Sequence, residues 1–354
     1  MKQIRFLLSL CALAAAMIAA PVQRTAAAES TPAAVTQADA PRLGWRGWLR
    51  KCVDRDEDRA RYAIHMEPGW QQASADLPVV VQLHGFNSTP GHTRPLLGPA
   101  RQAGLPCGQF AYPNDQPLRR SAELLSAELK CFAKQWPERE VALVTHSMGG
   151  LVARECIEDD ALYPGNVRRL IMVAPPTHGS SLARYAVGLD VWEHWLARRD
   201  GNPWRRVRES IADGLSEAPT DLRPGSAFLQ NLNSRPRREG VSYTVLLGSS
   251  AQLAEEQRYF VRQTLLRTAD RTPGWQADAA AIDRALSCMD EVVEGLGDGA
   301  VAIDRGRLAG VDDTVVLPFS HLGVVRAEGD AGCRQAQQVI LDRLLAETTA
   351  GAAE

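Results

Sequence analysis

Short apolar runs alternate along the chain with segments in which apolar residues recur at helical spacing. The runs 79–83, 141–144 and 170–173 are almost wholly apolar, as are strands that are covered on both faces. Between and after them, residues 118–132 and 148–157 place apolar side chains three or four positions apart, which predicts helices. Parallel strands need helical crossovers, so this alternation predicts an α/β fold with a mostly parallel sheet flanked by helices.

The alternation breaks after the third of these strands. Residues from about 181 to 236 contain three tryptophans, many arginines and no convincing strand, which predicts an inserted helical cap. A strand pattern resumes at 243–247, and a second, largely helical insertion is expected at about 251–285. A last strand at 315–317 and a helix at 334–345 then close the domain.

The N-terminus has the pattern of a secretory signal peptide. A short basic segment precedes an apolar run at 6–20, which is too short for a comfortable membrane span, and small residues follow it. We therefore expect a signal peptide at 1–28, a flexible leader at 29–43 and the folded domain at 44–354. Such a protein would be exported, to the periplasm or out of the cell.

Export changes the interpretation of the cysteines, because removal of the signal peptide leaves six of the seven. An even number in an oxidising compartment favours disulfides, and none of them has the C-x-x-C spacing of a zinc site. Connectivity cannot be deduced from sequence, and neighbourhood alone suggests the pairs Cys107–Cys131 and Cys288–Cys333. Buried free thiols are the alternative.

Composition excludes some partners. A chain of 354 residues with 45% hydrophobic and 23% charged residues can bury a large core, as soluble globular proteins do. Its formal net charge of −2 gives no indication of a nucleic acid partner. The sequence leaves the oligomeric state open.

A serine between small residues ends one of the predicted strands, in the run Thr145-His146-Ser147-Met148-Gly149-Gly150. A sharp turn from strand to helix presents such a hydroxyl outward, and a base that accepts its proton makes it a nucleophile. Ser147 is therefore the candidate nucleophile, although a serine here could also merely cap the helix. The usual turn pattern is G-x-S-x-G, and the bulkier Thr145 replaces its first glycine. Because Gly149 and Gly150 remain, we interpret this as a tolerated variant.

Three further loops at predicted strand ends carry reactive or small residues: His84-Gly85-Phe86, Gly297-Asp298-Gly299 and His321-Leu322-Gly323. Parallel sheets bind ligands beyond the carboxyl ends of their strands. These loops should therefore converge on Ser147.

Taken together, these motifs resemble the α/β-hydrolase superfamily, and within it the bacterial triacylglycerol lipases and PGAP1-like serine esterases. The segment 174–180 is similar to the Thr-Pro-His-x-Gly-Ser loop of those enzymes, and 221–233 is similar to the segment that ends their lid. The resemblance spans roughly 79–323. It implies an α/β-hydrolase fold with an inserted cap.

The resemblance also implies a catalytic triad. Ser147 would attack the substrate carbonyl, and His321 would act first as base and then as acid. Asp298 would hold the tautomer of the imidazole and stabilise its cation. The backbone N–H groups of Phe86 and Met148 would bind the oxyanion.

Each assignment has an alternative. Glycine-flanked aspartates such as Asp298 often only make turns, and four nearby carboxylates could replace it: Asp290, Asp304, Asp312 and Asp313. His321 could be a buried structural histidine. We interpret His84 as structuring its loop and His146 as packing beside the serine turn. The remaining histidines are interpreted as surface or structural residues: His65, His92, His178 and His194.

The expected function is that of a secreted serine hydrolase, an esterase or lipase that cleaves carboxylic esters. The tryptophans of the cap suggest an apolar acyl chain and a transient contact with a lipid interface, although a static cap is the alternative. An amidase, peptidase or thioesterase would use the same triad, and a non-catalytic binding protein could share the scaffold. We expect no cofactor, and no metal ligand cluster such as H-x-x-x-H is present. Activity should fall below about pH 6, because an ordinary histidine gains a proton near pH 6.5.

Overall fold

The computed structural model describes residues 62–86, 88–113, 116–181, 218–251, 253–271, 279–287, 289–326 and 331–346. The chain divides into two compact units. One comprises Tyr62–Arg258 and Cys288–Glu354, and the other comprises Met1–Arg61 and Tyr259–Ser287. The sheet and the candidate site belong to the first unit.

The described residues of this first unit form a seven-stranded sheet with the order β1-β3-β2-β4-β5-β6-β7. The strands are β1 (Ile64–Met66), β2 (Val79–Leu83), β3 (Cys107–Phe110), β4 (Val141–His146), β5 (Val167–Val173), β6 (Ser242–Gly248) and β7 (Thr314–Leu317). Only the β1–β3 pair is antiparallel within this sheet; the other pairs are parallel. The expected mostly parallel sheet is therefore confirmed.

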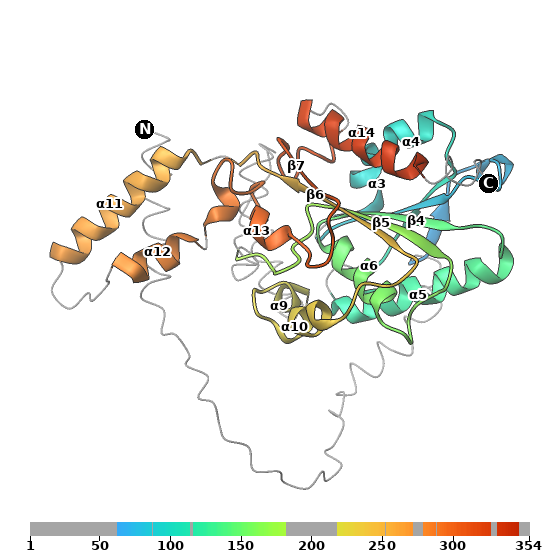
Figure 1. Cartoon of the computed structure of the whole chain (residues 1–354), viewed down its shortest axis with the longest axis horizontal. Helices are drawn as coiled ribbons and strands as arrows, with labels where there is room; N and C mark the ends of the chain where they lie inside the picture. Colours follow the sequence, from blue (N-terminus) through green and yellow to red (C-terminus); the bar gives the residue numbers. More distant parts are fainter. Residues whose placement is uncertain are drawn as a thin grey trace, which may run out of the picture. The chain divides into compact units, whose positions relative to one another are not determined.

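Helices cover both faces of the sheet. The described helices are α3 (Pro90–Thr93), α4 (Gly98–Gln102), α5 (Leu118–Gln135), α6 (Met148–Glu158), α9 (Ala218–Asp221), α10 (Ala227–Ser234), α11 (Glu255–Arg271), α12 (Ala279–Ser287), α13 (Ile303–Gly306) and α14 (Ala331–Leu345), with 3-10 turns η1 (Trp70–Gln72), η2 (Arg94–Leu97) and η4 (Asp290–Val292). Figure 1 shows α4 and α14 on one face and α5 and α6 on the other. Two apolar layers match this division: Leu125 and Leu151 belong to one, and Ala100 and Ile340 to the other.

The central strands are buried because both faces of the sheet are covered. Every residue of β2 and of β4 is buried. This burial explains why their sequences are continuous apolar runs instead of alternating ones. The carboxyl end of β4, which leads into the loop with Ser147, therefore lies in the middle of the core.

Helix α5 shows how the sequence sets one of the covering layers. Its apolar residues recur at helical spacing, and one face is buried along its length: Leu118, Ala122, Leu125, Leu129 and Phe132. The carboxylate of Asp221 accepts a hydrogen bond of 3.0 Å from the backbone N–H of Leu118. An acidic side chain there satisfies a helix N–H that has no partner within the helix.

Two predicted insertions fall partly within the described residues. For the expected cap at 181–236, residues 182–217 lie outside them, and the described remainder contains α9 and α10. The tryptophans Trp192, Trp195 and Trp204 fall in that outside segment. Helix α11 and most of helix α12, which ends at Ser287, lie in the segment 251–285, where the second helical insertion is expected. Within the second unit, Arg262 donates to both carboxylate oxygens of Asp283 at 2.6 and 2.9 Å.

The predicted Cys107–Cys131 disulfide is wrong. Cys107 is buried in β3 and Cys131 is exposed on α5, and neither thiol is in a disulfide. The side chain of Cys107 belongs to the apolar layer of α4 and α14, whereas α5 packs against the opposite face of the sheet. For the Cys288–Cys333 pair, Cys288 lies outside the described residues; Cys333 Sγ lies 3.2 Å from the carbonyl oxygen of Val324. That pair stays a prediction.

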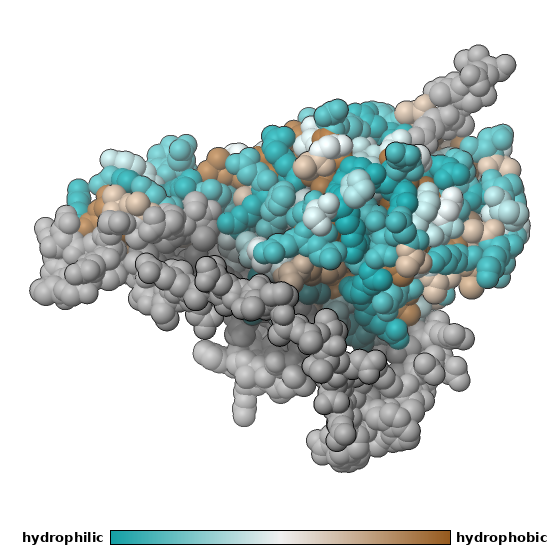
Figure 2. All heavy atoms as spheres, turned by 60° about the horizontal axis from the view of Figure 1, so that its bottom comes forward, coloured by the Kyte–Doolittle hydropathy of each residue, from teal (hydrophilic) through white to brown (hydrophobic). Residues whose placement is uncertain are grey.

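The described surface is mostly hydrophilic on the face shown in Figure 2. Large apolar side chains that are exposed among the described residues are Tyr259, Phe260, Leu296 and Val316. No helix within the described ranges is both long enough and apolar enough to cross a membrane. The predicted signal peptide, 1–28, and leader, 29–43, lie outside the described residues.

Candidate active site

Ser147 occupies a strained turn between β4 and α6. Its backbone angles are φ 53° and ψ −126°, a conformation that residues other than glycine rarely adopt. The turn is held by its neighbours, because Ser147 N–H donates to the Val173 carbonyl at 2.8 Å and Gly150 N–H donates to the Ser147 carbonyl at 3.0 Å. Strain that the surrounding structure maintains in this way is common at functional sites.

The structure accommodates Thr145 in place of the usual first glycine. Thr145 is completely buried, and its hydroxyl lies 3.4 Å from the Ile171 carbonyl of β5. A Cβ atom at Gly150 would lie only 3.3 Å from that hydroxyl. The missing side chain at position 150 therefore makes room for the threonine.

The His84-Gly85-Phe86 loop lies directly against the serine turn. A Cβ atom at Gly85 would lie 3.0 Å from the Cβ of Ser147, and one at Gly149 would lie 2.5 Å from the His84 carbonyl oxygen. Position 149 needs glycine for the two segments to come this close, and a side chain at position 85 would press against Ser147. The predicted convergence of this loop with Ser147 is therefore present in the structure.

Asp298 and His321 form a hydrogen-bonded pair. Nδ1 of His321 lies 2.8 Å from Oδ2 of Asp298. The other oxygen, Oδ1, accepts backbone N–H bonds from Ala300 at 2.9 Å and Val301 at 2.8 Å. Asp298 is 1% exposed. An ionised carboxylate only accepts hydrogen bonds, so Nδ1 carries the proton and Nε2 of the neutral ring is left as an acceptor.

The four alternative carboxylates do not take this position. Oδ2 of Asp298 is bonded to His321, whereas three of the alternatives have an arginine nitrogen within 4.0 Å: Asp290, Asp304 and Asp313. The carboxylate of Asp313 is bound by Arg343 at 2.7 and 2.9 Å. The geometry thus distinguishes Asp298 from neighbours that the sequence left open.

Two further histidines are buried beside the turn. Burial lowers the pKa of His84 to about 4, and the ring of His84 stacks on Tyr112 with centroids 4.2 Å apart. Burial, together with the charge that His321 can carry, lowers the pKa of His146 to about 3. Both rings are therefore neutral near pH 7. The Tyr112 hydroxyl donates to the His84 carbonyl, which supports the interpretation of His84 as a residue that structures its loop.

The two backbone amides expected to bind an oxyanion have no partner among the described residues. No carbonyl or side chain there accepts a hydrogen bond from the N–H of Phe86 or of Met148. Met148 is buried at the first position of α6, and Phe86 is half-buried against the apolar layer of α5. For Met148 the reason is its place at the helix N-terminus, where the first N–H groups have no partner inside the helix.

Sequence reasoning missed Glu291. This carboxylate is 1% exposed and accepts hydrogen bonds from the Ser181 N–H, the Ser180 hydroxyl and Nη1 of Arg305, the last two at 3.2 and 3.0 Å. The backbone carbonyl of Glu291 accepts from Gly299 N–H at 2.7 Å. Glu291 therefore ties the loop of Asp298 to the segment that enters the predicted cap, and no motif in the sequence marks it.

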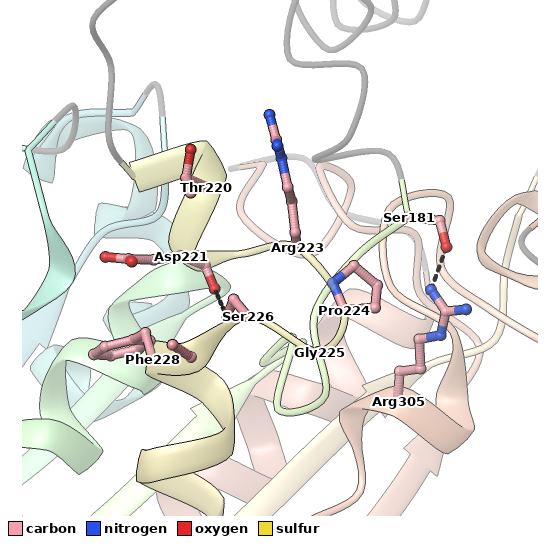
Figure 3. Close-up of a pocket in the computed structure, with 10 residues that line it drawn as sticks. Ser181, Thr220, Asp221, Arg223, Pro224, Gly225, Ser226, Phe228 and Arg305 are labelled. Carbon is pink, nitrogen blue, oxygen red and sulfur yellow. Dashed lines mark hydrogen bonds between the residues drawn. The ribbon is translucent and has the colours of Figure 1, made fainter. Parts of the chain in front are cut away.

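A cavity of about 480 Å³ lies where the predicted cap begins and ends (Figure 3). Ser181 and Arg305 line one side. The rest is lined by the end of α9, the loop that follows it and the start of α10, with Thr220, Asp221, Arg223, Pro224, Gly225, Ser226, Ala227 and Phe228. One dashed line in Figure 3 joins the Arg305 guanidinium to the Ser181 hydroxyl, and the other joins the Ser226 hydroxyl to the Asp221 carbonyl. Ser147, Asp298 and His321 are not among the lining residues.

The other predictions concern metals and the remaining histidines. The described residues contain no group of three or more His, Cys, Asp or Glu side chains arranged to hold a metal ion. His65, His92 and His178 are exposed, and His194 lies outside the described residues.

Known proteins resemble this chain in one segment by sequence and over most of its length by fold. Residues 116–202 match the family model of the PGAP1-like alpha/beta domain. No curated protein matches the sequence. The mature lipase BlEst2 of Bacillus licheniformis is 18% identical, with a TM-score of 0.52 over 79% of this chain and 97% of that one. Phospholipase PlaB of Legionella pneumophila is 18% identical, with a TM-score of 0.50 over 75% of this chain and 59% of that one.

These similarities concern architecture. At 18% identity they show the fold, which is that of the α/β hydrolases. The fold class predicted from the strand and motif order is therefore confirmed.

Proposed function

We propose that this protein is a serine hydrolase that cleaves carboxylic esters through an acyl-enzyme on Ser147. The observation that carries the proposal is the bond between Asp298 and His321, which leaves Nε2 of the imidazole as a proton acceptor. The strained turn at Ser147 supports a nucleophile at that position. The fold shared with a lipase and a phospholipase supports an ester as the substrate.

In the proposed reaction, Oγ of Ser147 attacks the ester carbonyl carbon while Nε2 of His321 takes the hydroxyl proton. Asp298 stabilises the resulting imidazolium. The negative oxygen of the tetrahedral intermediate accepts hydrogen bonds from the N–H groups of Phe86 and Met148. His321 then returns its proton to the departing alcohol, and water, activated by the same histidine, releases the acid from Ser147.

A fluorophosphonate probe and a substrate panel test this proposal. We expect the folded protein to hydrolyse p-nitrophenyl esters of graded acyl length faster than the matching anilides, and mass spectrometry to find the probe on Ser147. The Ser147→Ala variant should lose both the hydrolysis of the esters and the labelling by the probe. An unlabelled, inactive but folded wild type would favour a non-catalytic binding protein, and faster anilide cleavage would favour an amidase or peptidase.

The predicted export is a further part of this proposal. A signal peptide at 1–28 should be removed on secretion, leaving a mature chain that begins near Glu29. N-terminal sequencing of the protein recovered from the periplasm and from the medium would test the cleavage and distinguish the two locations. A protein that keeps Met1 in the cytoplasm would contradict it.

A further inference from the structure

His146, which precedes Ser147 in the chain, is hydrogen-bonded to the backbone of His321. It is the last residue of β4 and is 4% exposed. Its Nε2 lies 3.0 Å from the carbonyl oxygen of His321, and the two ring centroids are 4.8 Å apart. A carbonyl oxygen only accepts hydrogen bonds, so Nε2 of His146 carries a proton and donates it.

The other ring nitrogen of His146, Nδ1, is buried without a hydrogen bond to any described residue that would compensate for its loss of contact with water. Nδ1 has no hydrogen-bond partner among the described residues, and a Cβ atom at Gly85 would lie 3.3 Å from it. Burying a polar atom without a partner costs free energy. Packing alone would favour an apolar ring at this position, so the Nε2 bond is the distinguishing contribution of the histidine.

That bond completes the attachment of the His321 backbone. The N–H of His321 donates to the Asp298 carbonyl at 2.8 Å, and the carbonyl of His321 accepts from His146. One contact fixes the imidazole relative to its carboxylate. The other fixes it relative to β4, the strand that Ser147 follows.

We propose that His146 is a positioning residue, whose Nε2–H holds the His321 backbone so that the imidazole reaches the Ser147 hydroxyl. This inference rests on the function proposed above and adds a residue to its mechanism. His146 acts through the placement of His321.

A neutral donor suits this position. Burial lowers the pKa of His146 to about 3, so the ring keeps one proton, on Nε2, throughout the range in which an esterase works. A second cation beside His321 would oppose the positive charge that His321 acquires during the reaction. Lysine or arginine would donate equally well but would add that charge.

Two substitutions separate hydrogen bonding from packing. His146→Phe keeps a ring but removes the donor, whereas His146→Gln keeps a neutral N–H donor at a similar distance from the backbone. We expect the phenylalanine variant to lose about 10- to 100-fold in kcat with KM changed less than about two-fold, since small displacements of catalytic groups cost about this much. The glutamine variant should stay within about five-fold of wild type. Fluorophosphonate labelling rates of Ser147 should follow kcat.

Ser126→Ala is the matched control. Ser126 is buried in α5, and its hydroxyl also donates to a backbone carbonyl, that of Leu162. Its loss should lower the thermal unfolding temperature and leave kcat unchanged. If the phenylalanine variant does not fold, His146→Asn replaces it, because its shorter amide falls short of the His321 carbonyl and should also lose activity.

The outcomes are distinct for the two proposals. A folded wild type with neither ester hydrolysis nor a Ser147 adduct overturns the proposed function, and the role of His146 with it. An active wild type with an equally active phenylalanine variant overturns only the role of His146. Equal losses in the folded phenylalanine and glutamine variants would also overturn it, because they would indicate shape instead of the hydrogen bond.

Discussion

His321 is joined to Asp298 twice: Nδ1 lies 2.8 Å from the carboxylate, and the backbone N–H donates to the Asp298 carbonyl at 2.8 Å. The side-chain bond sets the tautomer of the ring, while the backbone bond holds the loop. The two effects can therefore be separated by a substitution that changes only the carboxylate.

Asp298→Asn should lower kcat by up to about 10⁴-fold while the fold is kept, because an amide can donate to Nδ1 and favours the wrong tautomer. Ester hydrolysis and the thermal unfolding temperature should be measured together. Asp313→Asn is the control: it breaks the pair with Arg343 and should affect stability more than turnover. A nearly normal Asp298→Asn variant beside an inactive Asp312→Asn variant would show that the acid has been assigned wrongly.

Ser147→Gly should be more stable than Ser147→Ala by about 1 kcal/mol, although glycine usually destabilises a fold. The reason is the backbone of this turn, since φ 53° with ψ −126° is strained for any side chain and easy for glycine. Both variants should lack ester hydrolysis, as should His321→Ala. Urea unfolding would provide the comparison, and an alanine variant as stable as the glycine variant would argue against strain at this residue.

Glu291→Gln should destabilise the protein by about 3 kcal/mol, because it leaves the Arg305 guanidinium without its buried carboxylate. It should also reduce kcat, since Glu291 supports the loop of Asp298. For comparison, Asp283→Asn breaks the exposed pair with Arg262 and should cost less than about 1 kcal/mol. Urea unfolding of both variants checks the difference, and equal effects would contradict the role given to Glu291.

Stability should fall as the pH drops from about 6.5 toward 4. The pKa values of His84 and His146 are lowered to about 4 and about 3 in the folded protein, so in this range the unfolded state binds more protons. His84 alone should account for about 3 kcal/mol by pH 4. The double variant His84→Gln/His146→Gln should show a shallower loss when urea midpoints are compared between pH 7 and pH 4. An unchanged slope would contradict this source of acid sensitivity.

The sequence predicts the centre of the fold better than its margins. The strand expected at 79–83 coincides with β2, because a strand buried on both faces has a continuous apolar run. The three-residue edge strand β1 is half-buried and has no such run, so it was not predicted. Sequence neighbourhood also suggested the Cys107–Cys131 disulfide, but it does not tell on which face of the sheet a side chain lies.

The candidate site was predicted in part for a similar reason. Motifs that depend on local geometry, such as the turn at Ser147, can be recognised from adjacent residues. The choice of Asp298 among five carboxylates depends on contacts over long sequence separations, and sequence alone left it open. Glu291 has no local signature, because its partners are distant in the sequence. Ser180 lies more than a hundred residues before it, and Arg305 lies in a later helix.

The fit between Thr145 and Gly150 has a consequence for how such turns are recognised. Crowding between the end of β4 and α6 depends on the combined volume at positions 145 and 150, so a missing side chain at position 150 of the helix can compensate for a larger residue in the strand. Searches that demand glycine two residues before the serine would overlook hydrolases built this way. A pattern that scores the two positions jointly would retrieve them.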